Sequence, residues 1–114
     1  MLRGEVWLAV WPNDPEQKER PLLIISNNLR NQASNLQDII VAKITSLQRG
    51  NGSSKPTNPQ EDVSILLRKA SIIRCASIYT IEKKTLTRKL TQLNISEMAQ
   101  VDQCLKTVLD LNYI

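Results

Sequence analysis

The chain has 114 residues, of which 41% are apolar, so we expect one domain over residues 1–114 and no second core. It contains no histidine, which removes the usual general base and the commonest zinc ligand. The formal net charge of +4 is uneven, because residues 43–93 carry +7 and the flanking segments carry −1 and −2. Such a basic segment attracts phosphates and other polyanions.

The two cysteines, Cys75 and Cys104, lie 29 positions apart and form no CxxC pair, so we expect free thiols. No metal site and no cofactor are expected. The N-terminus lacks the basic and apolar segments of a signal peptide. The apolar run Val6–Trp11 is far shorter than the ~18 residues of a membrane span. These features predict a cytoplasmic protein without a membrane segment.

The first half of the chain predicts three strands. Leu2–Val10 alternates loosely between apolar and polar residues and is followed by a polar loop, Pro12–Glu19. The continuous apolar run Pro21–Ser26 predicts a strand that is buried on both faces or lies in a tight barrel. Asn27–Asn35 is polar and can hold one helical turn, and the β-branched segment Asp38–Thr45 predicts a third strand.

The second half begins with Gln48–Gln60, which is rich in glycine, serine and proline and predicts a mobile loop. Val63–Leu67 and Ser71–Ile81 predict two more strands. Lys83–Lys89 is consistent with a short helical turn, and Lys89–Leu93 alternates again.

The last segment predicts an amphipathic helix with Asn94 or Ser96 at its start and Glu97 in position for a capping box. Its apolar stripe, which ends at Asn112, consists of Met98, Val101, Leu105, Val108 and Leu109. The predicted fold class is therefore mainly β (α+β), an antiparallel barrel-like sheet of about five strands with a C-terminal helix.

Several segments occur in an order that is typical of one family. These are Arg3–Trp7 (RGEVW), Arg20–Asn27 (RPLLIISN), Ile44–Ser46 (ITS), Thr80–Leu86 (TIEKKTL) and the C-terminal Asn94–Leu111. In these segments the chain resembles the MazF/PemK family of type II toxin endoribonucleases. The resemblance implies a CcdB/MazF-like fold and a homodimer that cleaves single-stranded mRNA without a metal. It also implies a cognate antitoxin whose acidic tail covers the active groove.

The resemblance implies that Arg20 and Thr45 are the catalytic residues. RNA is cleaved when its own 2′-hydroxyl attacks the adjacent phosphate, so the enzyme must orient the reacting oxygens and neutralise developing charge. An arginine fork suits two phosphate oxygens, and a threonine hydroxyl can donate to a third.

A second branch of the family uses an Arg-Cys-Asp triplet, which here reads Arg74-Cys75-Ala76 and lacks the carboxylate base. Its later Gln and Arg positions are Ser77 and Tyr79 in this chain. Either the protein uses Arg20 and Thr45 with Arg74 as a phosphate clamp, or its cleavage is weak, or its RNA preference differs. We expect Tyr79 to stack on a base, because aromatic faces accept any base.

The remaining candidate RNA-binding residues lie around these positions. Lys18 and Arg49 belong to the two loops that flank the expected site, as does Lys55, and their charges can follow the phosphates. Ser46 directly follows Thr45. Glu5 is expected to accept a proton or to orient Arg20 across adjacent strands.

Two other functions remain open. A CcdB-like gyrase poison would act through its C-terminal helix, and Asn112–Ile114 faintly resembles such an end. A catalytically impaired family member would bind RNA or antitoxin without cleavage, which Ala76 and Ser77 favour. The Arg20 and Thr45 motifs favour RNA cleavage.

Overall fold

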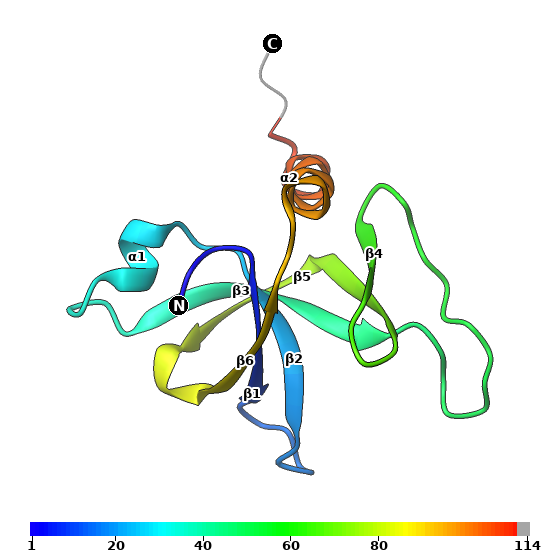
Figure 1. Cartoon of the computed structure of the whole chain (residues 1–114), viewed down its shortest axis with the longest axis horizontal. Helices are drawn as coiled ribbons and strands as arrows, with labels where there is room; N and C mark the ends of the chain where they lie inside the picture. The colour runs from blue at the N-terminus through cyan, green and yellow to red at the C-terminus, as the bar shows by residue number, and fades with distance from the viewer. Residues whose placement is uncertain (112–114) are drawn as a thin grey trace.

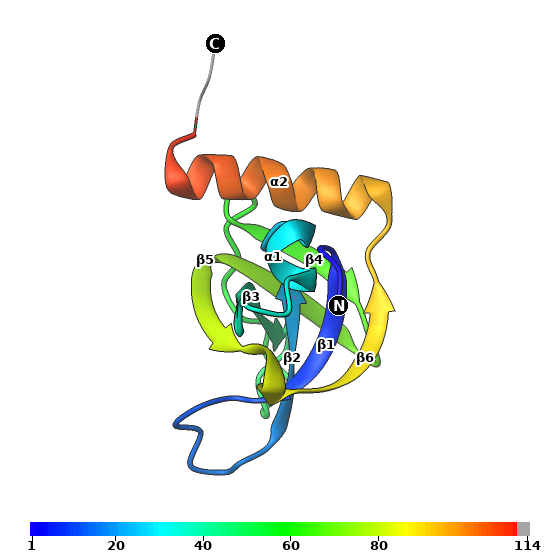
Figure 2. The same cartoon turned by 90° about the vertical axis from the view of Figure 1, so that its left-hand side faces the viewer.

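The computed structural model describes residues 1–111 and contains one antiparallel six-stranded sheet in the order β4-β5-β3-β2-β1-β6 (Figure 1). The strands are β1 (Glu5–Val10), β2 (Glu19–Ile24), β3 (Asp38–Ser46), β4 (Asp62–Leu66), β5 (Ala70–Glu82) and β6 (Leu86–Gln92). The helical segments are α1 (Asn28–Gln32), the 3-10 helix η1 (Lys83–Thr85) and α2 (Ile95–Leu109). The sheet curls, and α2 lies across one side of it (Figure 2). The predicted mainly-β fold with a C-terminal helix is confirmed.

The strand count differs from the prediction because β6 is a sixth strand. The helical turn predicted over Lys83–Lys89 ends at Thr85, and the rest of that segment pairs with β1. Every residue of β6 after Leu86 is exposed, so no buried face marks it in the sequence. Backbone pairing along the sheet edge forms this strand, and only its end coincides with the alternation seen in Lys89–Leu93.

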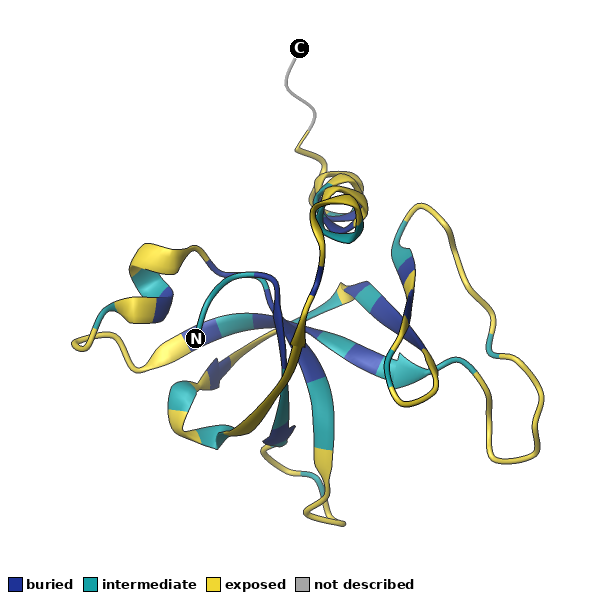
Figure 3. Cartoon of the chain, in the orientation of Figure 1, coloured by how far each residue is buried: buried dark blue, intermediate teal, exposed yellow. Residues whose placement is uncertain are grey.

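The core lies on both sides of the sheet, because neighbouring residues of a strand point to opposite faces. Leu23 packs in the cluster beneath α2, which includes Val101 and Leu105 of the helix. Leu22 and Ile24 pack in a second cluster with residues of β3 and β5. The prediction that the strand after Pro21 is buried on both faces is confirmed. Figure 3 shows buried positions along the centre of the sheet and exposed loops around it.

Helix α2 begins with the predicted capping box. Asn94 Oδ1 accepts the Glu97 backbone N–H at 2.8 Å, and Glu97 Oε1 accepts the Asn94 N–H at 2.9 Å. The helix ends at Leu109, and the C-cap residue Asp110 has a left-handed backbone with φ 56°. The N-terminal segment is joined to α2 by an ion pair between Arg3 Nη2 and Asp102 Oδ1 at 2.7 Å. Asn112, the predicted end of the apolar stripe, and the segment Asn112–Ile114 that resembles a gyrase-poison end lie outside the described residues.

Cys75 and Cys104 are free and buried in the cluster beneath α2, as the sequence predicts. Burial, together with nearby negative charge, raises the pKa of the Cys75 thiol to about 12. Both thiols therefore behave as small apolar groups at neutral pH. Across residues 1–111, none of the helices has the length and apolar composition to traverse a bilayer.

Candidate active site

A groove of about 740 Å³ lies where the start of β2 meets the end of β3. Ile44 packs in the cluster beneath α2, so its neighbours Lys43 and Thr45 point to the opposite face, where the groove opens. The groove walls come from the β1–β2 loop, β2, β3, the β3–β4 loop and β5. Its lining includes Trp11, Asn13, Asp14, Glu19, Arg20, Lys43, Thr45, Ser46, Lys55, Lys69, Ser71 and Tyr79.

Five of the predicted site residues line this groove together: Arg20, Thr45, Ser46, Lys55 and Tyr79. Tyr79 is 44% exposed, and its ring meets the Trp11 ring edge-to-face with centroids 5.1 Å apart. Ser46 Oγ donates to the Gln48 carbonyl at 3.0 Å. The groove therefore combines a charged end group, hydroxyls and an accessible aromatic face.

Arg20 is held by the β1–β2 loop. Its Nε donates to Asp14 Oδ2 at 2.9 Å, and its Nη2 lies 3.5 Å from Glu16 Oε2. The Arg20 side chain is 43% exposed, whereas that of Asp14 is 9% exposed. The hydrogen bond from Arg20 lowers the pKa of the Asp14 carboxyl, and the same bond raises the pKa of Arg20. Both groups are therefore charged at neutral pH.

The hydroxyl of Thr45 has no protein partner. Its Oγ1 is buried and makes no hydrogen bond to any residue within 1–111. A buried hydroxyl without a partner is costly, so most such groups find one in protein, water or a ligand. Thr45 also lines the groove, so a ligand bound there can supply the missing partner once the atoms that cover Oγ1 move aside.

The groove also holds three lysines: Lys43, Lys55 and Lys69. Lys43 and Lys69 were counted in the basic segment but were not predicted as site residues. Lys43 lies two positions before Thr45 on the same strand, so it shares that residue's face, and the period of two could have identified it. Lys69 lies in the β4–β5 turn and reaches the groove only through the tertiary fold.

Two predicted RNA-binding residues, Lys18 and Arg49, lie on the loops beside the groove and outside its lining. Lys18 Nζ pairs with Glu16 Oε2 at 2.7 Å and remains 65% exposed. Arg49 is exposed in a turn that its carbonyl closes by accepting the Gly52 N–H at 2.9 Å. Both side chains are exposed, so an extended polyanion can reach them outside the groove.

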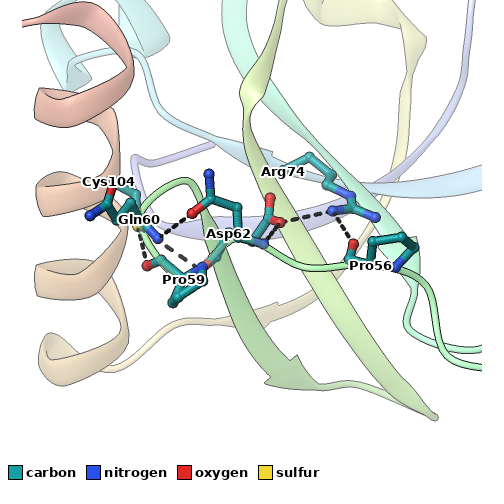
Figure 4. A network of polar contacts seen from close by, with 7 residues as sticks. Pro56, Pro59, Gln60, Asp62, Arg74 and Cys104 are labelled. Carbon is teal, nitrogen blue, oxygen red and sulfur yellow. Dashed lines mark hydrogen bonds and ion pairs between the residues drawn. The ribbon is translucent and has the colours of Figure 1, made fainter.

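Arg74 lies outside the groove lining and anchors the β3–β4 loop (Figure 4). Its Nη1 donates to Asp62 Oδ2 at 2.8 Å and to the Pro56 carbonyl at 3.1 Å. The same Asp62 oxygen accepts the Asn58 backbone N–H at 2.8 Å. The β3–β4 loop, which was predicted to be mobile, is therefore attached to β5 near the C-terminal end of the loop.

Asp62→Asn is expected to loosen this loop. The amide cannot replace the charged bond to Arg74, so backbone amides over residues 48–60 should exchange with deuterium about 10-fold faster or more, which corresponds to a net loss of about 1.4 kcal/mol. Hydrogen exchange measured by mass spectrometry checks this. Asp38→Asn, which changes an exposed aspartate at the start of β3, serves as the control. Unchanged exchange in Asp62→Asn would contradict the anchoring role.

Glu5 lies apart from the groove. Only 5% of this residue is exposed. Its Oε1 accepts the Trp7 Nε1–H at 2.9 Å and the Leu2 N–H at 2.8 Å, and its Oε2 pairs with Lys89 Nζ at 3.0 Å. The expectation that Glu5 orients Arg20 is wrong, because the strand register places Ala9 opposite Arg20. That Glu5 binds RNA directly stays a prediction.

Glu5→Gln is expected to lower stability by about 1–2 kcal/mol at neutral pH, because it removes the ion pair with Lys89. Burial alone would raise the pKa of Glu5, but hydrogen bonds from Trp7, Leu2 and Lys89 together lower it. The carboxylate therefore stabilises the fold above the ordinary pKa of 4.5, and this contribution is lost as the pH falls through the lowered folded value.

Urea unfolding between pH 7 and pH 3 measures this effect. The stability difference between wild type and Glu5→Gln should shrink as the pH falls below 4.5. A difference that stays constant over this range would show that the Glu5 charge does not stabilise the fold.

The curled antiparallel sheet, the C-terminal helix and the basic groove define the class of MazF-like toxin folds, and comparison with solved structures agrees. An endoribonuclease in complex with its cognate antitoxin from Mycobacterial species superposes with a TM-score of 0.75 at 23% identity, covering 100% of this chain and 99% of that one. Mycobacterium tuberculosis toxin MazF-mt6 gives 0.73 at 22% identity, with 96% and 99% coverage. A MazE-MazF structure from Deinococcus radiodurans gives 0.67 at 18% identity, with 96% and 94% coverage.

The family itself is shown by a sequence comparison. The model of the PemK-like, MazF-like toxins of type II toxin-antitoxin systems matches residues 2–109. The chain belongs to this family. The resemblance found in the ordered motifs is therefore confirmed over nearly the whole sequence.

Proposed function

We propose that this protein is a toxin endoribonuclease that cleaves single-stranded mRNA in its basic groove and thereby inhibits translation and growth. The observation that carries the proposal is that Arg20 and Thr45, 25 positions apart in sequence, line one groove with three lysines. Residues 1–111 bring together no cluster of three or more carboxylates and cysteines that could bind a metal. We propose, as the family resemblance implies, that the reaction needs no metal ion.

In this reaction the 2′-hydroxyl oxygen attacks the adjacent phosphorus, and the bond to the 5′-oxygen breaks. The 2′-hydroxyl loses its proton, the leaving 5′-oxygen gains one, and the products are a 2′,3′-cyclic phosphate and a 5′-hydroxyl. Arg20 neutralises the charge that develops on the phosphate oxygens. Its raised pKa makes it a poor proton donor, so it acts by its charge. Thr45 Oγ1 donates to a phosphate oxygen and so gains the partner that it lacks.

The rest of the groove holds the RNA strand in this proposal. Lys43, Lys55 and Lys69 contact flanking phosphates, and Lys18 and Arg49 extend this charge along the two loops. A base stacks on the exposed face of Tyr79. The edge-to-face contact between the Tyr79 and Trp11 rings holds the Tyr79 ring in place. Ser46 lies beside Thr45 in the lining, and Arg74 acts by fixing the β3–β4 loop.

The same charges suit an antitoxin. An acidic peptide presents carboxylates that the groove lysines can bind, and it would compete with RNA. Two of the structural relatives were crystallised as toxin–antitoxin complexes. We also propose a homodimer, because β6 leaves a sheet edge exposed along almost its whole length. Sedimentation at micromolar concentration distinguishes a dimer from a monomer.

The test is incubation of the purified protein with long single-stranded transcripts in EDTA, with a gyrase supercoiling assay in parallel. Discrete cuts that leave 2′,3′-cyclic phosphate ends support the proposal. Gyrase inhibition without RNA cleavage would replace it with the CcdB-like function. Tight RNA binding without any cut would instead identify a catalytically impaired member of the family.

A further inference from the structure

The β1–β2 loop is built around Asp14. Its Oδ1 accepts the Glu16 N–H at 3.0 Å, and its backbone N–H donates to the Trp11 carbonyl at 3.2 Å. Its carbonyl accepts both the backbone N–H of Gln17 at 3.1 Å and the Gln17 side-chain amide at 3.0 Å. These contacts fix the carboxylate in one place inside the groove wall, where its side chain is 9% exposed.

The second oxygen of the Asp14 carboxylate binds the Nε side of the Arg20 guanidinium. Asp14 Oδ2 accepts the Nε–H at 2.9 Å, which is the only hydrogen bond that Arg20 makes with its side chain within residues 1–111. A guanidinium is planar, so a bond at Nε orients the plane and leaves the two terminal nitrogens as a fork. One of them, Nη2, lies 3.5 Å from Glu16 Oε2, an ion pair that phosphate would have to replace. A bidentate contact to phosphate can use that fork.

We propose that Asp14 is a positioning residue that holds the Arg20 guanidinium in the orientation needed to meet the reacting phosphate. The inference rests on the proposed RNA cleavage and adds a residue that the sequence motifs did not identify. Arg20 has a long side chain with many rotamers and is 43% exposed, so without a fixed partner it would sample several orientations. Because Asp14 already holds the Arg20 side chain in one orientation, less conformational entropy is lost when RNA binds.

Asp14→Ala should therefore lower kcat by about 10- to 100-fold, because a misplaced catalytic group costs this much. KM should change by less than about 3-fold, because the Arg20 charge remains. Asp14→Asn keeps an acceptor oxygen for Nε–H and should recover part of kcat. Asp38→Asn, which removes an exposed carboxylate outside the groove lining, serves as the control and should stay within about 3-fold of wild type.

A double-mutant cycle separates positioning from a general structural effect. Lysine has no Nε–H for Asp14 to hold, so in an Arg20→Lys background Asp14→Ala should cost little further activity. Equal losses in both backgrounds would overturn the proposal. An increase in cleavage by Asp14→Ala would also overturn it, since the carboxylate would then be obstructing the phosphate.

The hold on Arg20 can be measured without RNA. The Arg20 Nε–Hε signal in nuclear magnetic resonance spectra should exchange slowly in wild type and rapidly in Asp14→Ala. If wild type cleaves no RNA, the proposed function fails, while a protected Hε proton would still support the Asp14–Arg20 pairing. An unprotected Hε proton in wild type would overturn the pairing, whatever the cleavage assay shows.

Discussion

Arg20→Ala is expected to reduce the rate of RNA cleavage by about 1,000-fold or more, a loss typical of removing an arginine that stabilises a phosphoryl transition state. Arg20 is the one arginine that lines the groove within residues 1–111. Its side chain is 43% exposed and lies outside both core clusters, so the protein should still fold; loss of the partner of Asp14 should lower the thermal midpoint by about 5 °C.

Single-turnover cleavage of a defined RNA measures this loss, and calorimetry measures the midpoint. Arg68→Ala is the matched control, because it removes one exposed positive charge from the basic segment at a position outside the groove lining. It should change the rate by less than about 3-fold. Full activity in a folded Arg20→Ala protein would refute the assignment of Arg20.

Thr45→Val is expected to change activity and stability in opposite directions. Valine keeps the branched shape and removes the hydroxyl proposed to donate to phosphate, so the rate should fall about 100-fold. The same hydroxyl is buried without a partner in the free protein, so its removal should raise stability by about 0.5–1 kcal/mol. Such opposition is typical of a group kept for function at a cost in stability.

Cleavage kinetics and urea unfolding of the same preparations check both signs. Thr45→Ser keeps a hydroxyl at this position and should retain activity to within about 10-fold of wild type. A fully active Thr45→Val protein would show that the hydroxyl takes no part in the reaction. A large loss of stability in that variant would show that Thr45 serves packing.

The elements that sequence patterns predict well are those with a buried face. Pro21–Ser26 is continuously apolar because it packs on both sides, and the stripe of α2 follows from packing on one side. Strand β6 has no such face. Its formation depends on hydrogen bonds to β1, which side-chain periodicity does not record.

The site was only partly predictable for a related reason. Motif resemblance identified Arg20 and Thr45, and the aromatic face of Tyr79 suggested base stacking at a position that departs from the family pattern. The fold brings all three into one groove. Asp14 was read only as part of a polar loop, because its importance depends on a loop conformation that pairs it with Arg20. Glu5 was misplaced relative to Arg20 because strand register, and therefore position along the strand, cannot be read from a period of two.

Location of bound RNA on the protein tests the central claim most directly. A single-stranded RNA blocked by 2′-deoxy substitution at the cut site can be titrated into the labelled protein and followed by chemical shifts. The proposed site predicts the largest changes at Arg20 Nε–Hε, Thr45 and Tyr79, with little change along α2. Changes concentrated on α2, with the groove residues unaffected, would contradict the proposal that this groove binds and cleaves RNA.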